Sequence, residues 1–256
     1  MTADRGELTP GIRSEKLKKL FISIIDPDDT EAITSYLRFE DDNRFERQDS
    51  TESRDLRVEK LKRKISAGDT VVILACDGDK IVASSSVTDL GPDSQEAWAD
   101  GTLVQQNYRK EGMGRELSLM QEEAARKASK EAIVTAINFD NLGSIALRMR
   151  SGYVLGRAGL SWQNKGCYGL RKDLENKNPE QTDWATKVLA GEIKVPSVSD
   201  DAGKFNDQLL IDVGDFEGIK DILTKGYRGV YLLMPEDFPD EKDKPINKNY
   251  IVFVKA

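Results

Sequence analysis

The sequence predicts an α/β protein in which a mixed, mostly antiparallel sheet of six to seven strands is flanked by helices. Two kinds of pattern alternate along residues 20–173. Short apolar runs are typical of strands, and longer segments with apolar residues three and four positions apart are typical of helices. Pairs of turn-forming residues separate them. The resulting order is β-α-α-β-β-β-α-β-α-β-β.

The first strand is expected at residues 20–25, and a helix follows it. Asp26 can cap this helix, Pro27 suits its first position, and the face is formed by Ala32, Ile33, Tyr36 and Leu37. A polar stretch then leads to a second helix, which ends before Gly68 and whose stripe consists of Val58, Leu61 and Ile65.

The next two strands form a hairpin through Asp77 and Gly78, a pair that tolerates the positive φ of a tight turn. A further strand at 97–104 runs into a turn with two glycines. Behind this turn an apolar stripe predicts a helix and consists of Leu117, Met120, Ala124 and Ala128. A strand at 131–139, a helix at 142–152 and an antiparallel pair at 153–162 and 166–174 complete the sheet.

The composition divides the chain into four parts. We expect a polar tail at 1–19, the main domain at 20–173, and a linker with a short helix at 174–207. A β-α-β-β region at 208–256 would either form a small domain or extend the main sheet. Its residues indicate no particular chemistry.

The charge and residue usage exclude several classes of function. With 45 acids against 38 bases the net charge is −7, which argues against general affinity for nucleic acid or anionic membranes and favours a neutral or cationic substrate. The absence of histidine excludes an imidazole base, and the two cysteines, Cys76 and Cys167, do not have the spacing of a zinc site, so no metal is expected. Without a signal-peptide pattern, the chain is predicted to be cytoplasmic.

The turn with two glycines, NYRKEGMGREL at 107–117, lies where a strand becomes a helix. The first amides of a helix have no intrahelical partner and attract anions. Gly112 and Gly114 would let a diphosphate approach these amides, while Arg109, Lys110 and Arg115 would add positive charge. The alternative is a plain tight turn with solvated bases. The spacing matches neither the dinucleotide-binding fingerprint nor a P-loop.

Several separated segments resemble the GNAT superfamily of acetyl-CoA-dependent N-acetyltransferases, over about residues 20–173. VQQNYRKEGMG is similar to the central motif of that family, R/Q-x-x-G-x-G/A, with Arg109, Gly112 and Gly114 in place. NLGSIALRMRSGY resembles its second motif, through Asn141, Ser144, Leu147, Gly152 and Tyr153. IIDPDDTEAI and YGLRKDL resemble its opening and closing segments. The resemblance implies a GNAT-like fold and acetyl-CoA as co-substrate.

The resemblance also implies the cofactor-binding residues. The CoA diphosphate would lie on the backbone of Lys110, Glu111, Gly112, Met113, Gly114 and Arg115. The pantetheine arm would pair with the strand at Leu103, Val104 and Gln105. Asn141 and Ser144 would contact the arm, although an asparagine at this place is also a common helix cap. Tyr153 is most simply a core residue.

The same resemblance suggests a catalytic arrangement, with one departure. The Val104 N–H would stabilise the tetrahedral oxyanion. Alternation places Glu96, Trp98, Asp100, Thr102 and Val104 on one strand face, and among these we expect Asp100 to be the base, with Glu96 second, unless both are solvated acids. Many relatives have a tyrosine as general acid where this chain has Arg148. Arg148 would either stabilise the thiolate or face solvent, with Tyr108 and Tyr168 as weaker candidates for the acid.

These features lead to one main hypothesis and two alternatives. The main hypothesis is an N-acetyltransferase in which a primary amine attacks acetyl-CoA directly in a ternary complex. Acidic segments at 40–45 and 92–100 suggest a cationic acceptor such as a polyamine, an aminosugar, a lysine or a peptide N-terminus. The first alternative is an acyl-CoA sensor with little or no turnover that acts through its C-terminal region. The second treats that region as a dimerisation element, which would make the protein a homodimer.

Overall fold

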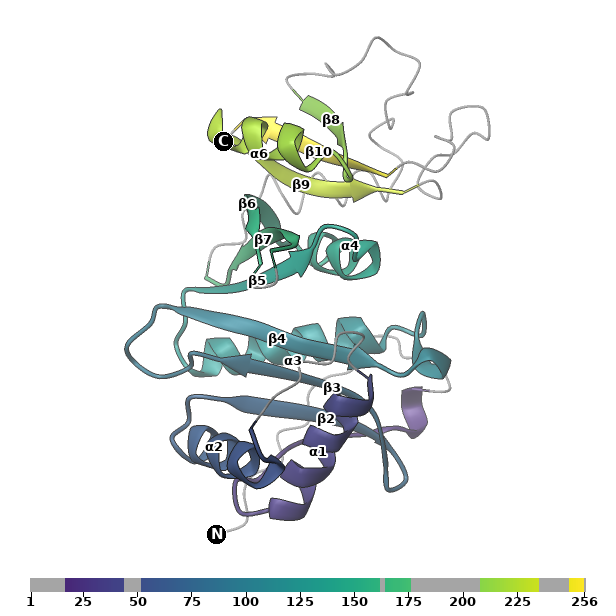
Figure 1. Ribbon diagram of the computed structural model, residues 1–256, viewed down its shortest axis with the longest axis vertical. Coiled ribbons are helices and arrows are strands. Elements are labelled where there is room, and N and C mark those ends of the chain that lie inside the picture. Colours follow the sequence, from purple (N-terminus) through teal and green to yellow (C-terminus); the bar gives the residue numbers. More distant parts are fainter. Residues whose placement is uncertain (1–16, 44–51, 162–163, 176–207, 235–248, 256) are drawn as a thin grey trace. The chain divides into compact units, whose positions relative to one another are not determined.

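The computed structural model describes residues 17–43, 52–161, 164–175, 208–234 and 249–255 of the chain (Figure 1). These residues fall into two compact units. Unit 1 contains the described residues up to Thr88 together with Asp100–Gln121, and unit 2 contains Asp89–Ala99 and the described residues from Glu122 onward. Strand β4 (Glu96–Val104) and helix α3 (Met113–Lys127) are divided between the units, so that each element has one part in unit 1 and the other part in unit 2.

Unit 1 is built from an antiparallel sheet with helices on its faces. Strand β1 pairs with β2, and β2 with β3, in antiparallel register. The second half of β4 follows β3 in the strand order. The elements before β4 are η1 (Leu17–Lys19), β1 (Phe21–Ile24), α1 (Thr30–Asn43), α2 (Arg54–Ser66), β2 (Val71–Asp77) and β3 (Lys80–Thr88).

Strand β2 divides the core of unit 1 into two clusters because successive side chains of a strand point to opposite faces. Val72 and Leu74 pack in one cluster with residues of α1 and α2, including Ile33 and Val58. The other cluster combines β2 and β3 residues with the first turns of α3, and its members are Leu17, Leu20, Ile73, Ala75, Val82, Ala83, Met113 and Leu117. The beginning of α3 is therefore fixed by its apolar contacts.

The start of the chain differs from the expectation in three respects. Asp26 does not cap α1: its carboxylate accepts the N–H of Asp28 in a preceding turn, and Asp29 instead accepts the N–H of Ala32 at 2.8 Å. The helix also continues to Asn43, through residues assigned to a polar loop. Leu17, which was assigned to the polar tail, is buried in the core. The sequence could not identify the cap of α1, because three nearby acids precede the helix and any of them can accept a backbone N–H.

Unit 2 contains the remaining strands of a mostly antiparallel sheet, with the order β4-β5-β7-β6-β9-β10-β8. Its one parallel pair among the described strands is β4 with β5. The elements after α3 are β5 (Ala132–Asn138), α4 (Leu142–Arg150), β6 (Val154–Leu160), β7 (Gly166–Asp173), β8 (Gln208–Asp212), α6 (Phe216–Thr224), β9 (Tyr227–Leu233) and β10 (Tyr250–Lys255). The sheet class and the element order of residues 20–173 are as predicted.

The C-terminal strands extend the sheet of unit 2. Strand β9 pairs with β6 at Leu155 and Gly229, and β10 lies between β9 and β8. Phe216 of α6 stacks on Tyr168 with ring centroids 5.8 Å apart, and the Tyr168 hydroxyl donates to the Val213 carbonyl at 2.7 Å. Of the two arrangements that the sequence left open, the described residues therefore show the sheet extension. The helix expected within 174–207 lies outside the described residues.

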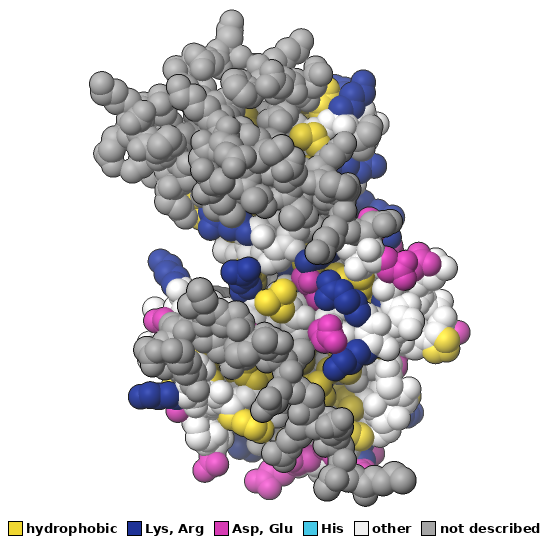
Figure 2. All heavy atoms as spheres, turned by 180° about the vertical axis from the view of Figure 1, so that it is seen from behind, with side chains coloured by type: hydrophobic (Ala, Val, Ile, Leu, Met, Phe, Trp, Pro, Cys, Tyr) yellow, Lys and Arg dark blue, Asp and Glu magenta, His cyan; other side chains and the backbone are white. Residues whose placement is uncertain are grey.

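Figure 2 shows how the charged side chains of the described residues are distributed on one side of the molecule. Its described Lys and Arg side chains are interspersed with Asp and Glu and do not form one large basic patch. Among the described helices, none combines the length and the hydrophobicity needed to cross a bilayer.

Candidate cofactor site and catalytic residues

Strand β4 leaves its parallel partner halfway along its length. Its pairing with β5 joins Glu96 to Ala132 and ends where Trp98 meets Val134, although β4 continues to Val104. Exposed and buried residues alternate from Glu96 to Asp100 and then stop alternating. Gly101 has a φ of +59°, which interrupts the extended backbone. The expected common face therefore holds for Glu96, Trp98 and Asp100 but is not seen for Thr102 and Val104.

The turn between β4 and α3 contains two residues in the left-handed region. Lys110 has a φ of +63° and Gly112 a φ of +94°. Glycine adopts the second value without strain, whereas other residues rarely do. A Cβ atom on Gly112 would meet only the Leu17 side chain, at 3.8 Å. The backbone conformation, more than crowding, therefore requires glycine here.

The first amides of α3 have no acceptor in the part of the chain that the structure describes. The carbonyl of Gly112 accepts the N–H groups of Arg115 at 3.0 Å and Glu116 at 3.1 Å, which begins the helical pattern. The N–H groups of Gly112, Met113 and Gly114 have no hydrogen-bond partner among the residues that the structure describes. These three donors lie at the positive end of a 15-residue helix. They are the arrangement that an anion such as a phosphate requires.

The basic side chains of the turn differ in what they contact. Lys110 and Arg115 are exposed and form no ion pair with a described residue. Arg109 instead folds back on the strand, where its Nε donates to the Val104 carbonyl at 2.9 Å. Glu111 is half-buried, and the Met113 side chain is buried in the core, so Met113 can offer a ligand only its backbone. Two of the three predicted cations thus remain available to an anion.

Three further hydrogen bonds join the turn to the neighbouring hairpin. The Gln105 N–H donates to the Val82 carbonyl at 2.9 Å, and its side-chain amide donates to Ile81. Tyr108, in the turn η2 (Gln106–Tyr108), donates its hydroxyl to the Asp77 carboxylate at 2.6 Å. This hydrogen bond, with smaller effects of desolvation and of the Asp77 charge, raises the pKa of Tyr108 above its ordinary value.

The two acids predicted as catalytic bases have different surroundings. Asp100 is exposed, and its carboxylate accepts the N–H of Gly101 at 2.7 Å. Its carbonyl accepts the side-chain amide of buried Gln121 at 3.1 Å, which holds this part of the strand in place. Glu96 forms an ion pair with Arg171 at 2.8 Å, and Arg171 also pairs with Asp173. Of the two acids, Asp100 therefore has the carboxylate that forms no ion pair with a described residue.

Asn141 occupies the position of a helix cap. Its side-chain oxygen accepts the N–H of Ser144 at 3.2 Å, at the start of α4. This is the simpler of the two roles considered for Asn141. Ser144 is half-buried and belongs to the first turn of the helix.

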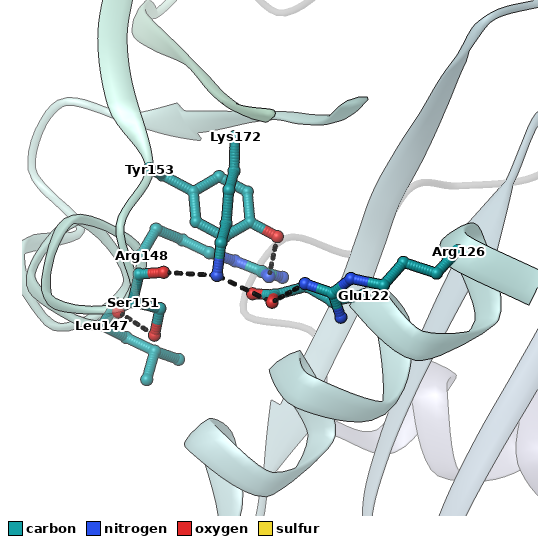
Figure 3. A network of polar contacts seen from close by, with 7 residues as sticks. All are labelled: Glu122, Arg126, Leu147, Arg148, Ser151, Tyr153 and Lys172. Atoms are coloured by element: carbon teal, nitrogen blue, oxygen red, sulfur yellow. Dashed lines mark hydrogen bonds and ion pairs between the residues drawn. The ribbon is translucent and has the colours of Figure 1, made fainter. Parts of the chain in front are cut away.

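Arg148 does not face solvent, so that alternative is wrong. It is 4% exposed, and its Nη1 donates to the Tyr153 hydroxyl at 3.0 Å. The guanidinium carbon also lies 5.0 Å from the centroid of the Tyr153 ring. Tyr153 is fully buried, in keeping with its expected core position. Figure 3 shows Arg148 directed from α4 toward Tyr153.

A buried carboxylate, Glu122, lies beside this pair in unit 2 (Figure 3). It is 1% exposed and accepts the Lys172 ammonium at 2.7 Å, while Arg126 approaches the same oxygen at 3.4 Å. Lys172 also donates to the carbonyl of Ser151 at 2.7 Å. The second oxygen of Glu122 has no hydrogen-bond partner among the described residues. The ion pair thus joins α3, β7 and the end of α4.

The remaining candidate for the general acid is enclosed. Tyr168 is fully buried and donates to Val213. Desolvation, with smaller contributions from the charges of Asp215 and Asp212, raises its pKa well above the ordinary value. Its proton is therefore held in the core of unit 2.

The sequence pattern missed the polar contacts of α3. The buried face of this helix consists of Met113, Leu117, Ser118, Gln121, Glu122 and Ala125. The predicted stripe is right at Leu117, whereas its other members, Met120, Ala124 and Ala128, are only half-buried. An apolar pattern cannot reveal a buried face that contains three polar residues. The hydrogen bond between Asp77 and Tyr108 could not be predicted for another reason: the sequence pattern assigns Asp77 to a hairpin turn. Among the described residues, no group of acids or cysteines has the arrangement of a metal site.

Removal of the Glu122 charge is expected to destabilise the protein strongly. In Glu122→Gln, the ammonium of Lys172, whose side chain is 21% exposed, loses its counter-charge at a position that is 1% exposed, and breaking a largely buried ion pair in this way costs about 3 kcal/mol. The free energy of unfolding, measured in urea, should fall by this amount. Glu123→Gln is the control, because Glu123 is more exposed and pairs with Lys127 along the helix surface, where a loss of less than ~0.5 kcal/mol is expected. Equal small losses would contradict the buried pair.

Comparison with known proteins places this geometry in a family. Residues 31–153 match the model of the acetyltransferase (GNAT) family. No curated protein matches the sequence significantly. Among solved structures, yncA of Salmonella typhimurium, solved with its cofactor acetyl-CoA, is 19% identical; the match covers 61% of this chain and 95% of that one, with a TM-score of 0.50.

Two other solved structures have the same fold. A GNAT-family acetyltransferase from Streptococcus pneumoniae is 16% identical over 60% of this chain and 99% of that one, with a TM-score of 0.51. A variant of the spermidine N-acetyltransferase SpeG from Vibrio cholerae is 10% identical over 64% of this chain and 99% of that one, with a TM-score of 0.50. The family match thus covers residues 31–153, and the solved structures, all below 25% identity, show that the chain has the fold of GNAT acetyltransferases.

Proposed function

We propose that the protein transfers an acetyl group from acetyl-CoA to a primary amine. The observation that carries this proposal is the set of three N–H groups at Gly112, Met113 and Gly114, at the start of α3, that have no acceptor among the described residues. They coincide with the glycines of the family motif. The CoA diphosphate would accept these N–H groups, and Lys110 and Arg115 would neutralise its charge.

The proposed place of the pantetheine arm follows from the direction of the β4 backbone. The Gln105 N–H points toward β3, where it bonds to Val82. Successive N–H groups of a strand point in opposite directions, so the Val104 N–H points away from β3. On that side the pairing of β4 with β5 has already ended, at Trp98. Residues 103–105 would pair with the arm, and the Val104 N–H would stabilise the oxyanion. Asn141 and Ser144 remain proposed contacts of the arm.

The proposed reaction needs no covalent enzyme intermediate. The neutral amine attacks the thioester carbonyl and a C–N bond forms, which gives a tetrahedral intermediate whose oxyanion the Val104 N–H stabilises. Asp100, directly or through water, accepts the proton that the nitrogen loses. The C–S bond then breaks, and CoA leaves as a thiolate that takes a proton from solvent. Glu96 is the second candidate for the base, although Arg171 occupies its carboxylate.

The exposed side chains beside Asp100 support a cationic acceptor. Trp98 and Glu96 lie on the same strand face and are both exposed. The Arg171 charge is already shared between Glu96 and Asp173, so the acids are in excess here. An indole face and carboxylates together suit an ammonium group. The proposed acceptors are a polyamine, an aminosugar, a lysine or a peptide N-terminus.

The surroundings of Arg148 favour a second candidate function, an acyl-CoA sensor with little turnover. Arg148 replaces the usual tyrosine, and its guanidinium bonds to buried Tyr153. The hydroxyls of Tyr108 and Tyr168 bond to Asp77 and Val213. None of these three residues is placed as a general acid. Tight acetyl-CoA binding without acetyl transfer to a broad amine panel would support the sensor.

A glutamate at position 112 is expected to abolish acetyl-CoA binding. In Gly112→Glu the carboxylate and the strained backbone would both disturb the three N–H groups. Calorimetric titration should show binding to the native chain and none to the variant. Gly226→Glu is the control, because Gly226 has a similar φ of +88° and a Cβ added there would meet nothing within 4 Å. The proposed site would be contradicted if Gly112→Glu still bound acetyl-CoA. It would also be contradicted if Gly226→Glu lost binding as well.

Removal of the proposed base is expected to slow catalysis without weakening cofactor binding. Asp100→Asn should lower kcat by roughly 10²- to 10⁴-fold, the usual contribution of a general base. Its dissociation constant for acetyl-CoA should stay unchanged. Asp93→Asn, at an exposed loop position, is the control. A normal kcat in Asp100→Asn, with a reduced one in Glu96→Gln, would transfer the role to Glu96.

A further inference from the structure

The hydrogen bond between Tyr108 and Asp77 joins two parts of unit 1 that are 31 positions apart in the sequence. Tyr108 ends the turn η2, and Asp77 ends β2, next to Gly78 in the hairpin. At 2.6 Å the phenol and the carboxylate form a short, charge-assisted bond. Both residues lie in unit 1, as does the whole turn from β4 to α3.

The ring of Tyr108 adds an apolar contact within unit 1. It packs against the cluster that contains Met113 and Leu117, the first buried residues of α3. Tyr108 therefore contacts the hairpin through its hydroxyl, and its ring packs against the apolar cluster that also holds the start of α3. The residues between Tyr108 and Met113 include the two with left-handed φ values, Lys110 and Gly112. Their backbone sets the direction of the three N–H groups.

The bond also determines the state of the phenol. The hydrogen bond to Asp77, desolvation and the charge of Asp77 all raise the pKa of Tyr108. The proton therefore stays on the phenol at neutral pH and is directed at Asp77. Tyr108 is thus suited to fix the turn in place and poorly suited to protonate a thiolate.

We propose that Tyr108 and Asp77 form a positioning pair that fixes the turn of residues 109–114 for the diphosphate of CoA. This inference rests on the proposed function, because it assigns the diphosphate to that turn. Loss of the bond leaves the three N–H groups present but less well oriented. The predicted effect is weaker CoA binding with little change in fold stability.

Calorimetric titration with CoA tests the pair. In Tyr108→Phe the ring contacts remain and only the hydroxyl is lost, so the dissociation constant should rise by about three- to tenfold, the range expected for one exposed charge-assisted bond. Asp77→Ala should cause an equal rise, and the double variant no further one. Asp77→Asn should restore most of the affinity, because its amide oxygen can still accept the phenol proton.

Controls distinguish three cases: an effect of the pair on the CoA-binding turn, an effect on the stability of the whole fold, and the absence of a CoA site. Tyr227→Phe makes the same chemical change in β9, which belongs to unit 2, and should leave CoA affinity unchanged. Melting temperatures of all variants should match that of the native chain. Unchanged affinity in Tyr108→Phe, or a fall in melting temperature that parallels the loss of affinity, would overturn the pair. Absence of CoA binding to the native chain would instead overturn the proposed function.

Discussion

The left-handed backbone at Gly112 is the constraint on which the proposed site depends. With a φ of +94°, this residue turns the chain from β4 into α3 and leaves three successive N–H groups without an acceptor among the described residues. Unpaired donors at a helix start are stable only in contact with water or a ligand. A side chain at position 112 would strain this conformation, and a capping side chain would fill the place of the ligand. The glycine thus keeps these N–H groups available to an anion, at the cost of local stability.

Helix α3 combines this open N-terminus with a buried polar face. Met113 and Leu117 hold its first turns in the apolar core of unit 1. In unit 1 Gln121 donates to the carbonyls of Ser86 and Asp100, and in unit 2 Glu122 pairs with Lys172. Each of these side chains has a specific partner, and such partners fix the rotation of a helix more strictly than apolar packing does. A helix with a fixed rotation presents its first amides in a fixed direction.

Much of the fold could be predicted from the sequence because residues 20–173 keep clear periodicities and turn signals. The hairpin after β2 and the glycines of the β4–α3 turn lie where local chemistry predicts them, although the two turn residues of the hairpin are Gly78 and Asp79, and Asp77 is the last residue of β2. The buried face of α3 could not be predicted, since Ser118, Gln121 and Glu122 interrupt its apolar pattern. Arg148 is buried beside Tyr153, to which it donates a hydrogen bond. The hydrogen bond between Tyr108 and Asp77 joins residues 31 positions apart. Such pairs become visible only when the chain is folded.

The central claim, that the amides at the start of α3 bind the CoA diphosphate, can be measured directly by ¹⁵N–¹H correlation spectroscopy during a titration with CoA. The amide protons of Gly112, Met113 and Gly114 should shift strongly downfield as they begin to donate to phosphate oxygens. Saturation should follow a single dissociation constant. CoA binding that shifts other resonances and leaves these three unchanged would contradict the account.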